Sequence, residues 1–161
     1  MIGKSRFALF FGNRGFFPAS LQASAREEMS RVLKGLGHEV LMLDAEVAAL
    51  AVCDLETLGR VTGHSHVIEM WFAADPERER LYMLSGGRDA ADWVLNLRRN
   101  PSVKVRLGGR WRRGTASEIE GSEDDGLARR LLAAKYQGWS EGGRLSSWAR
   151  HSLPIAVDLE R

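Results

Sequence analysis

The chain contains one cysteine, four prolines and two tyrosines among its 161 residues. A single cysteine, Cys53, excludes both an internal disulfide and a cysteine-rich metal site. No stretch approaches the roughly 20 consecutive apolar residues that a membrane helix needs. The N-terminal stretch has an apolar run of only five residues and no small-residue cleavage pattern. We therefore expect a cytoplasmic protein with no secretion signal and no contact with a membrane.

The composition is that of an ordinary globular protein, with 44% hydrophobic and 27% charged residues. These fractions exclude a wholly disordered chain, a collagen-like repeat and a coiled coil. The length fits one domain, or one domain with a short appendage.

Charge is unevenly distributed although the formal net charge is only +2. The stretch 98–113 carries seven cations and no anion, whereas acids gather in 118–125. Val103, Val105 and Leu107 alternate with Lys104 and Arg106, a pattern typical of a strand with one solvated face. A basic stretch beside a tryptophan is also a feature of nucleic-acid binders. The low net charge favours a solvated sheet face, or a patch for a small anion, over nucleic acid.

The first part of the chain reads as a strand–helix–strand unit. Apolar runs predict strands at Phe7–Phe11 and His38–Asp44, and helical spacing of apolar residues predicts a helix over Ala19–Gly35. Such units usually pair their two strands in parallel. We expect residues 1–47 to form a β-α-β appendage that needs a partner to bury its sheet.

From residue 48 onward, short apolar runs alternate with glycine-rich turns. Helices are expected at Asp89–Asn100, ended by Pro101, and at Ser122–Tyr136, where Ser122 and Asp125 resemble a capping box. We predict an α+β domain over 48–161: a small, mostly antiparallel split β-barrel with flanking helices. The strands are expected at Cys53–Leu58, Val67–Phe72, Leu81–Leu84, Val103–Leu107, Trp111–Ile119 and Ile155–Leu159.

The segment Ser85-Gly86-Gly87-Arg88 lies where a strand is expected to meet a helix. Glycines let the backbone approach a ligand and adopt positive φ. Backbone amides, one hydroxyl and one guanidinium together favour an anion such as phosphate. A plain strand-to-helix turn explains the same residues equally well.

A second turn, Gly59–Gly63, could bring Arg60 and the hydroxyl of Thr62 to the same anion, although a hairpin with a solvent-facing arginine is the simpler interpretation. His64 and His66 alternate ahead of a carboxylate, but no further spaced ligand supports a metal site, and we expect none. Tyr136 is a candidate for an aromatic lid over a planar ligand; ordinary packing is the alternative.

Five segments together resemble the deazaflavin-dependent nitroreductase family, within the flavin-binding split β-barrel group. The resemblance extends over residues 52–159, and its motifs occur in the family's order. They are Leu55–Gly63 (LETLGRVTG), Ile68–Phe72 (IEMWF), Leu81–Arg88 (LYMLSGGR), Trp93–Pro101 (WVLNLRRNP) and Leu107–Gly109.

This resemblance implies a six-stranded antiparallel split barrel, often dimeric, that binds a deazaflavin along a basic groove. The implied cofactor is an 8-hydroxy-5-deazaflavin coenzyme, with FMN or FAD as the alternative. The implied reaction is hydride transfer to a quinone, a nitro compound or a similar small-molecule acceptor. The carry-over places Trp71 and Trp93 beside the groove and Tyr136, as a catalytic candidate, over the substrate. The implied contacts on the phosphate side are Arg60, Thr62, Ser85, Gly86, Gly87 and Arg88.

The N-terminal piece resembles the first β-α-β unit of L-fucose/L-arabinose isomerases through Phe7–Pro18 (FALFFGNRGFFP) and Leu36–Asp44 (LGHEVLMLD). The metal and sugar ligands of those enzymes come from later domains, so this resemblance implies no isomerase activity. Two other functions stay open for the whole chain. One is a barrel that binds or stores the cofactor without turnover, and the other is nucleic-acid binding through 98–113.

Overall fold

The computed structural model describes residues 6–8, 28–29, 31–33, 35–36, 39–41, 47, 49–75 and 78–160. The chain divides into two compact units, Met1–Leu43 and Asp44–Arg161. In the first unit, strands β1 (Arg6–Ala8) and β2 (Glu39–Leu41) pair in parallel, and helical residues lie between them in the sequence. The other parts of the two strands predicted there, and the start of the predicted helix, lie outside the described residues.

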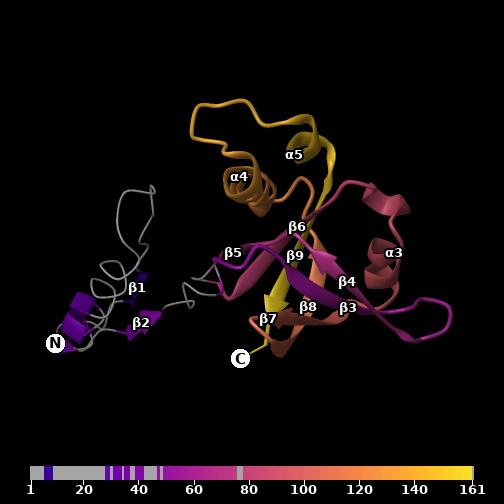
Figure 1. Cartoon of the computed structure of the whole chain (residues 1–161), viewed down its shortest axis with the longest axis horizontal. Helices are drawn as coiled ribbons and strands as arrows, with labels where there is room; N and C mark the ends of the chain where they lie inside the picture. Colours follow the sequence, from indigo (N-terminus) through magenta and orange to yellow (C-terminus); the bar gives the residue numbers. More distant parts are fainter. Residues whose placement is uncertain are drawn as a thin grey trace. The chain divides into compact units, whose positions relative to one another are not determined.

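The second unit is built on one antiparallel sheet of seven strands in the order β4-β3-β7-β8-β9-β6-β5 (Figure 1). Strands β4 and β5 are its two edges, so the curled sheet is an open half-barrel. The strands are β3 (Cys53–Leu58), β4 (Ser65–Met70), β5 (Ala73–Asp75), β6 (Arg80–Ser85), β7 (Ser102–Leu107), β8 (Arg110–Glu118) and β9 (Leu153–Leu159).

Helices flank this sheet. A 3-10 turn, η1 (Arg88–Ala90), leads from β6 into α3 (Asp92–Arg99), and the backbone leaves the helix at Asn100, ahead of Pro101, as predicted. Helix α4 (Glu123–Gln137) confirms the second predicted helix. A five-residue helix, α5 (Ser147–His151), precedes β9 and was not predicted. No helix in the described ranges is long and apolar enough to cross a membrane.

The six-stranded barrel implied by the resemblance is corrected to seven strands. The additional strand is β5, three residues long and hydrogen-bonded to β6 through Ala73↔Tyr82 and Asp75↔Arg80. The sequence there reads only as a turn signal around Pro76, because three residues are too few to show a two-residue period.

The core has two parts that share β6 and β9. Leu81, Met83 and Ile155 face the inside of the curled sheet with residues of α3, whereas Tyr82 and Ala156 pack on the other side with α4. Burial on both faces removes the alternation of apolar and polar residues from these strands. Strand β7 has one solvated face and alternates as predicted.

Three of the seven cations in the basic stretch 98–113 form close ion pairs within the fold. Lys104 and Arg106 on β7 pair with Glu56 and Asp54 directly across on β3, at 2.7 and 2.6 Å. Arg98 pairs with a glutamate at the end of β8 at 2.5 Å. These pairs support the prediction of a solvated sheet face.

The expected capping box at the start of α4 is wrong in detail. The Ser122 hydroxyl donates to the carbonyl of Ile119 at 2.7 Å instead of accepting from the helix. Asp125 reaches back one residue further than the motif requires and accepts from the backbone N–H of Gly121 at 2.9 Å. The carboxylate thus satisfies a backbone donor of the turn preceding the helix.

We predict that Gly114→Ala lowers the free energy of unfolding by about 1–3 kcal/mol, because a methyl group would overpack the β8–β9 contact. An added Cβ would lie 2.7 Å from the carbonyl oxygen of Asp158 and 2.9 Å from a methyl of Val157. Urea unfolding followed by circular dichroism measures the change. Gly126→Ala on α4 is the control, since there the Cβ meets only the flexible end of Arg130. Equal destabilisation by both substitutions would contradict the prediction.

Candidate functional site

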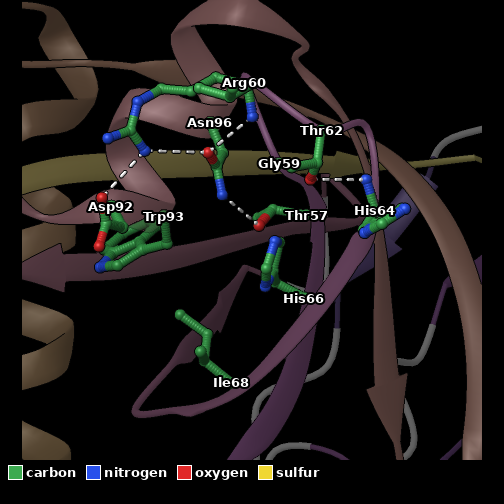
Figure 2. A pocket seen from close by; sticks show the side chains of 11 residues that line it. Thr57, Gly59, Arg60, Thr62, His64, His66, Ile68, Asp92, Trp93 and Asn96 are labelled. Atoms are coloured by element: carbon green, nitrogen blue, oxygen red, sulfur yellow. Dashed lines mark hydrogen bonds and ion pairs between the residues drawn. The ribbon is translucent and has the colours of Figure 1, made fainter.

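A cavity of about 450 Å³ lies between the β3–β4 turn and helix α3 (Figure 2). Its lining combines one guanidinium, hydroxyls and imidazoles with the apolar surfaces of Ile68 and Trp93. Three of the site residues proposed from the sequence line it, namely Arg60, Thr62 and Trp93. The others lining it are Thr57, Gly59, Val61, His64, His66, Ile68, Asp92 and Asn96.

Arg60 is held over the cavity by α3. Its guanidinium Nη1 pairs with Asp92 at 2.9 Å and donates to Oδ1 of Asn96 at 3.3 Å, and its backbone N–H donates to the same oxygen at 3.0 Å. The two interactions of the guanidinium, with Asp92 and with Asn96, both use Nη1. The side chain of Asp92 is 84% exposed. The remaining N–H donors of Arg60 are therefore available to an anionic ligand.

Asn96 is the residue that fixes this geometry. Its side chain is buried, and its Nδ2 donates to the hydroxyl of Thr57 on β3 at 3.2 Å while its Oδ1 serves Arg60. One end of the amide therefore holds strand β3 and the other holds the β3–β4 turn against the helix. Asn96 is thus a structural hydrogen bonder, and its partner Arg60 lies 36 residues away, where the pattern of an amphipathic helix gives no signal of it.

The turn itself is shaped by two glycines and a histidine. The N–H of Gly59 donates to the carbonyl of His64, and that of Gly63, at φ +69°, donates to the carbonyl of Gly59, both at 2.8 Å. A Cβ on Gly59 would lie 2.8 Å from Nε2 of His66. Glycine is thus required for the imidazole of His66 to lie against the turn, at the wall of the cavity (Figure 2).

The turn at Ser85–Arg88 does not line this cavity. Ser85 is buried, and its hydroxyl donates to the carbonyl of Arg88 at 3.1 Å. The left-handed backbone expected at the glycines occurs at Arg88 instead, with φ 49°. The Arg88 guanidinium donates to both carboxylate oxygens of Glu120, at 2.8 and 2.9 Å, and to the carbonyl of His151 at 2.6 Å.

Aromatic side chains form a third cluster, outside the cavity lining. Trp71 stacks on Tyr136 at 4.6 Å between ring centroids, with 5° between the planes, and meets Trp148 edge-on at 5.6 Å. The Tyr136 hydroxyl lies 2.8 Å from the carbonyl of Phe72 and 2.7 Å from that of Ala51, and it accepts from the N–H of Phe72 at 3.0 Å. Burial raises the pKa of Tyr136, so the phenol stays protonated at neutral pH.

Among the residues that the structure describes, there is neither a cluster of metal ligands nor a reactive thiol. Within the described residues, no group of three His, Cys, Asp or Glu side chains could hold a metal ion. The thiol of Cys53 is buried in the core, and burial raises its pKa to about 12. At neutral pH it is a protonated, apolar side chain.

Solved structures share the fold over about three quarters of this chain at low sequence identity. A conserved hypothetical protein from Mycobacterium tuberculosis matches with a TM-score of 0.60 and 20% identity, covering 74% of this chain and 82% of its own. An F420 reductase matches at 0.52 and 19%, covering 73% and 93%. A FAD-binding protein from Mesorhizobium loti matches at 0.51 and 22%, covering 73% and 86%. No curated protein matches the chain.

Fold and sequence together define an oxidoreductase built on a split β-barrel. The sequence profile of the F420H(2)-dependent quinone reductase family matches residues 25–160, and the chain belongs to that family. Its cofactor class is therefore the deazaflavin F420, as the resemblance implied, and it is an enzyme of the reductase class. The resemblance of the N-terminal piece to sugar isomerases is unsupported, since the family match begins within that piece, at residue 25.

We predict that Asn96→Ala lowers the free energy of unfolding by about 1–3 kcal/mol, because it leaves the buried hydroxyl of Thr57 and the backbone N–H of Arg60 without their partner. Thermal or urea unfolding measures the loss. Asn100→Ala is the matched control, since that amide accepts only from the N–H of Ser102 at an exposed position. A loss no larger than that of the control would contradict the role given to Asn96.

We predict that Cys53 does not react with Ellman's reagent at pH 8 while the protein is folded. With a pKa of about 12 the thiolate is about one part in 10⁴ at that pH. The same reagent in 8 M urea should titrate one thiol per chain, which serves as the control. Stoichiometric labelling of the folded protein within minutes would show that the thiol is accessible.

Proposed function

We propose that the cavity beside Arg60 holds the anionic part of F420 and that the half-barrel orients the reduced cofactor for hydride transfer to a quinone, a nitro compound or a similar acceptor. The observation that carries this proposal is the donor set of the cavity. A guanidinium with unused N–H groups, a threonine hydroxyl and two imidazoles border an apolar wall of Ile68 and Trp93. That combination suits a ligand with both an anionic and an apolar part.

The chain's residues then act by binding, orienting and excluding water, while the bound deazaflavin supplies the hydride. Arg60 would donate to the anion, with Asn96 holding its backbone in place. Thr62 and His66 would supply further donors. Trp93 and Ile68 would shield an apolar portion of the cofactor from solvent.

The other residues proposed from the sequence take different roles in this proposal. Ser85, Gly86 and Gly87 would form a backbone border at the end of β6, and Trp71 would present its exposed ring to a planar molecule. Tyr136 would support Trp71 from behind, because its hydroxyl is engaged by backbone groups. Arg88 would organise the border through Glu120 and His151.

Residues 48–161 would constitute the cofactor-binding domain, and 1–47 an appendage to it.

We also propose that the cytoplasmic protein pairs with a second copy of itself through the outer face of the sheet. The register places Leu58, Val67 and Trp111 on that face, and each is more than a third exposed. Analytical ultracentrifugation measures this association, and a monomer at micromolar concentration would contradict it.

One observation favours a second function, cofactor binding or storage without turnover. The single hydroxyl proton that Tyr136 could offer at the aromatic cluster is already directed at backbone carbonyls, and the hydroxyl oxygen accepts from a backbone N–H. Tight binding of F420 with no reduction of menadione or a nitroarene by the reduced cofactor would select this function over the reductase. Binding to nucleic acid is disfavoured by the ion pairs along 98–113.

We predict that Arg60→Met raises the Kd for F420 about 10- to 100-fold, the effect of losing a charge-assisted hydrogen bond worth about 1.5–3 kcal/mol. Fluorescence titration of the deazaflavin measures it. Arg110→Met, an exposed arginine in the β7–β8 hairpin, is the control and should change the Kd less than twofold. Binding of equal strength in both variants would place the cofactor elsewhere, and no binding by the wild-type protein would refute the proposed function.

A further inference from the structure

The C-terminal end of α5 is capped by two arginines from distant parts of the chain. Arg129 on α4 donates through Nη1 to the carbonyls of Ala149, Arg150 and Ser152 at 2.7, 2.9 and 2.9 Å. Arg88 donates to the carbonyl of His151 at 2.6 Å. Four consecutive carbonyls, which a short helix leaves without internal partners, are thereby satisfied by two guanidinium groups.

The charges of this cap are balanced by two carboxylates. Asp125, one turn before Arg129 on α4, accepts from its Nε at 2.5 Å. Both carboxylate oxygens of Glu120 accept from Nη2 of Arg88, and one of them lies 3.7 Å from Nη2 of Arg129. Arg129 is only 8% exposed. A buried guanidinium with this many partners requires them all in place, because each lost partner leaves a buried polar group unsatisfied.

The short helix thus held carries Trp148. A Cβ on Gly86 would lie 3.7 Å from the Trp148 ring, so the ring is in contact with the turn at the end of β6. The same ring meets Trp71 edge-on, and Trp71 stacks on Tyr136. Trp148 therefore joins the Ser85–Gly87 turn to the aromatic cluster, and its position depends on where α5 lies.

We propose that Arg129 and Arg88 are positioning residues that set Trp148 against Gly86 and Trp71, and so shape the aromatic wall which a planar acceptor meets. The effect on the acceptor rests on the proposed function, whereas the positioning itself does not. Neither arginine needs to touch a ligand. A five-residue helix has little stability alone, and the arginine cap with its ion pairs holds this helix in one defined position.

The test compares Arg129→Gln with Arg130→Gln, a matched change at the exposed neighbour on the same helix. The Trp71–Trp148 contribution to near-ultraviolet circular dichroism is first defined by subtracting the spectrum of Trp148→Phe from that of the wild type. We expect Arg129→Gln to retain its far-ultraviolet spectrum, lose at least half of that contribution and raise the KM for menadione about fivefold or more. The Kd for F420 should change less than twofold. Arg130→Gln should behave as the wild type.

A folded Arg129→Gln protein with an unchanged near-ultraviolet contribution would overturn the proposal, as would a KM shift matched by Arg130→Gln. If Arg129→Gln fails to fold, two milder variants decide. Ser146→Ala removes the hydroxyl that accepts from the N–H of Ala149 at the other end of α5, and Arg88→Gln removes the bond to the carbonyl of His151 together with the two to Glu120. Each should reduce the same spectral contribution, and no change in either would refute the positioning role. If the wild type shows no turnover, the proposed function fails, but the spectra still test the positioning.

Discussion

Strands β6 and β9 are buried on both faces, and the arrangement of the whole second unit follows from this constraint. Their inner side chains fill the curl of the sheet with α3, and their outer side chains pack under α4. After β6 ends at Ser85, η1 and α3 follow, and α3 meets the β3–β4 turn where Asn96 and Asp92 contact Arg60. The cavity beside Arg60 exists because that turn docks on α3 through Asn96.

The sequence was sufficient to predict those elements whose residue pattern follows from their own solvent exposure and length. Apolar and polar residues alternate along strand β7 because one of its faces is exposed to solvent, and α4 is long enough for its boundaries to be predicted. Strand β5 and helix α5 were missed because neither is stable without its neighbours. Three residues of β5 gain order from pairing with β6, and five residues of α5 gain it from two arginine caps. Such elements are decided by tertiary contacts that no local pattern records.

The same distinction separates the candidate site residues. Arg60, Thr62 and Trp93 line one cavity, so the two separate motifs that contain them do converge in space. The turn at Ser85–Arg88 offered an equally good anion-binding pattern in the sequence. The partner of the Arg88 guanidinium in that turn, however, is the carboxylate of Glu120, 32 residues away. An internal carboxylate and a ligand phosphate satisfy a guanidinium in the same way, so the motif alone could not distinguish a cofactor contact from a structural ion pair.

The two arginine side chains are about equally exposed, 38% for Arg60 and 42% for Arg88, so the number of partners that a ligand must displace decides which of them is available. The carboxylate that pairs with Arg60 is 84% exposed, and an ion pair of this kind is worth about 0–1 kcal/mol, less than the about 1.5–3 kcal/mol that a charge-assisted bond to a ligand anion contributes. A ligand at Arg88 would instead have to replace both oxygens of a carboxylate and a backbone carbonyl together, and would release the end of α5. Anion binding is therefore favoured at Arg60, and the guanidinium at Arg88 serves the fold from which Trp148 projects.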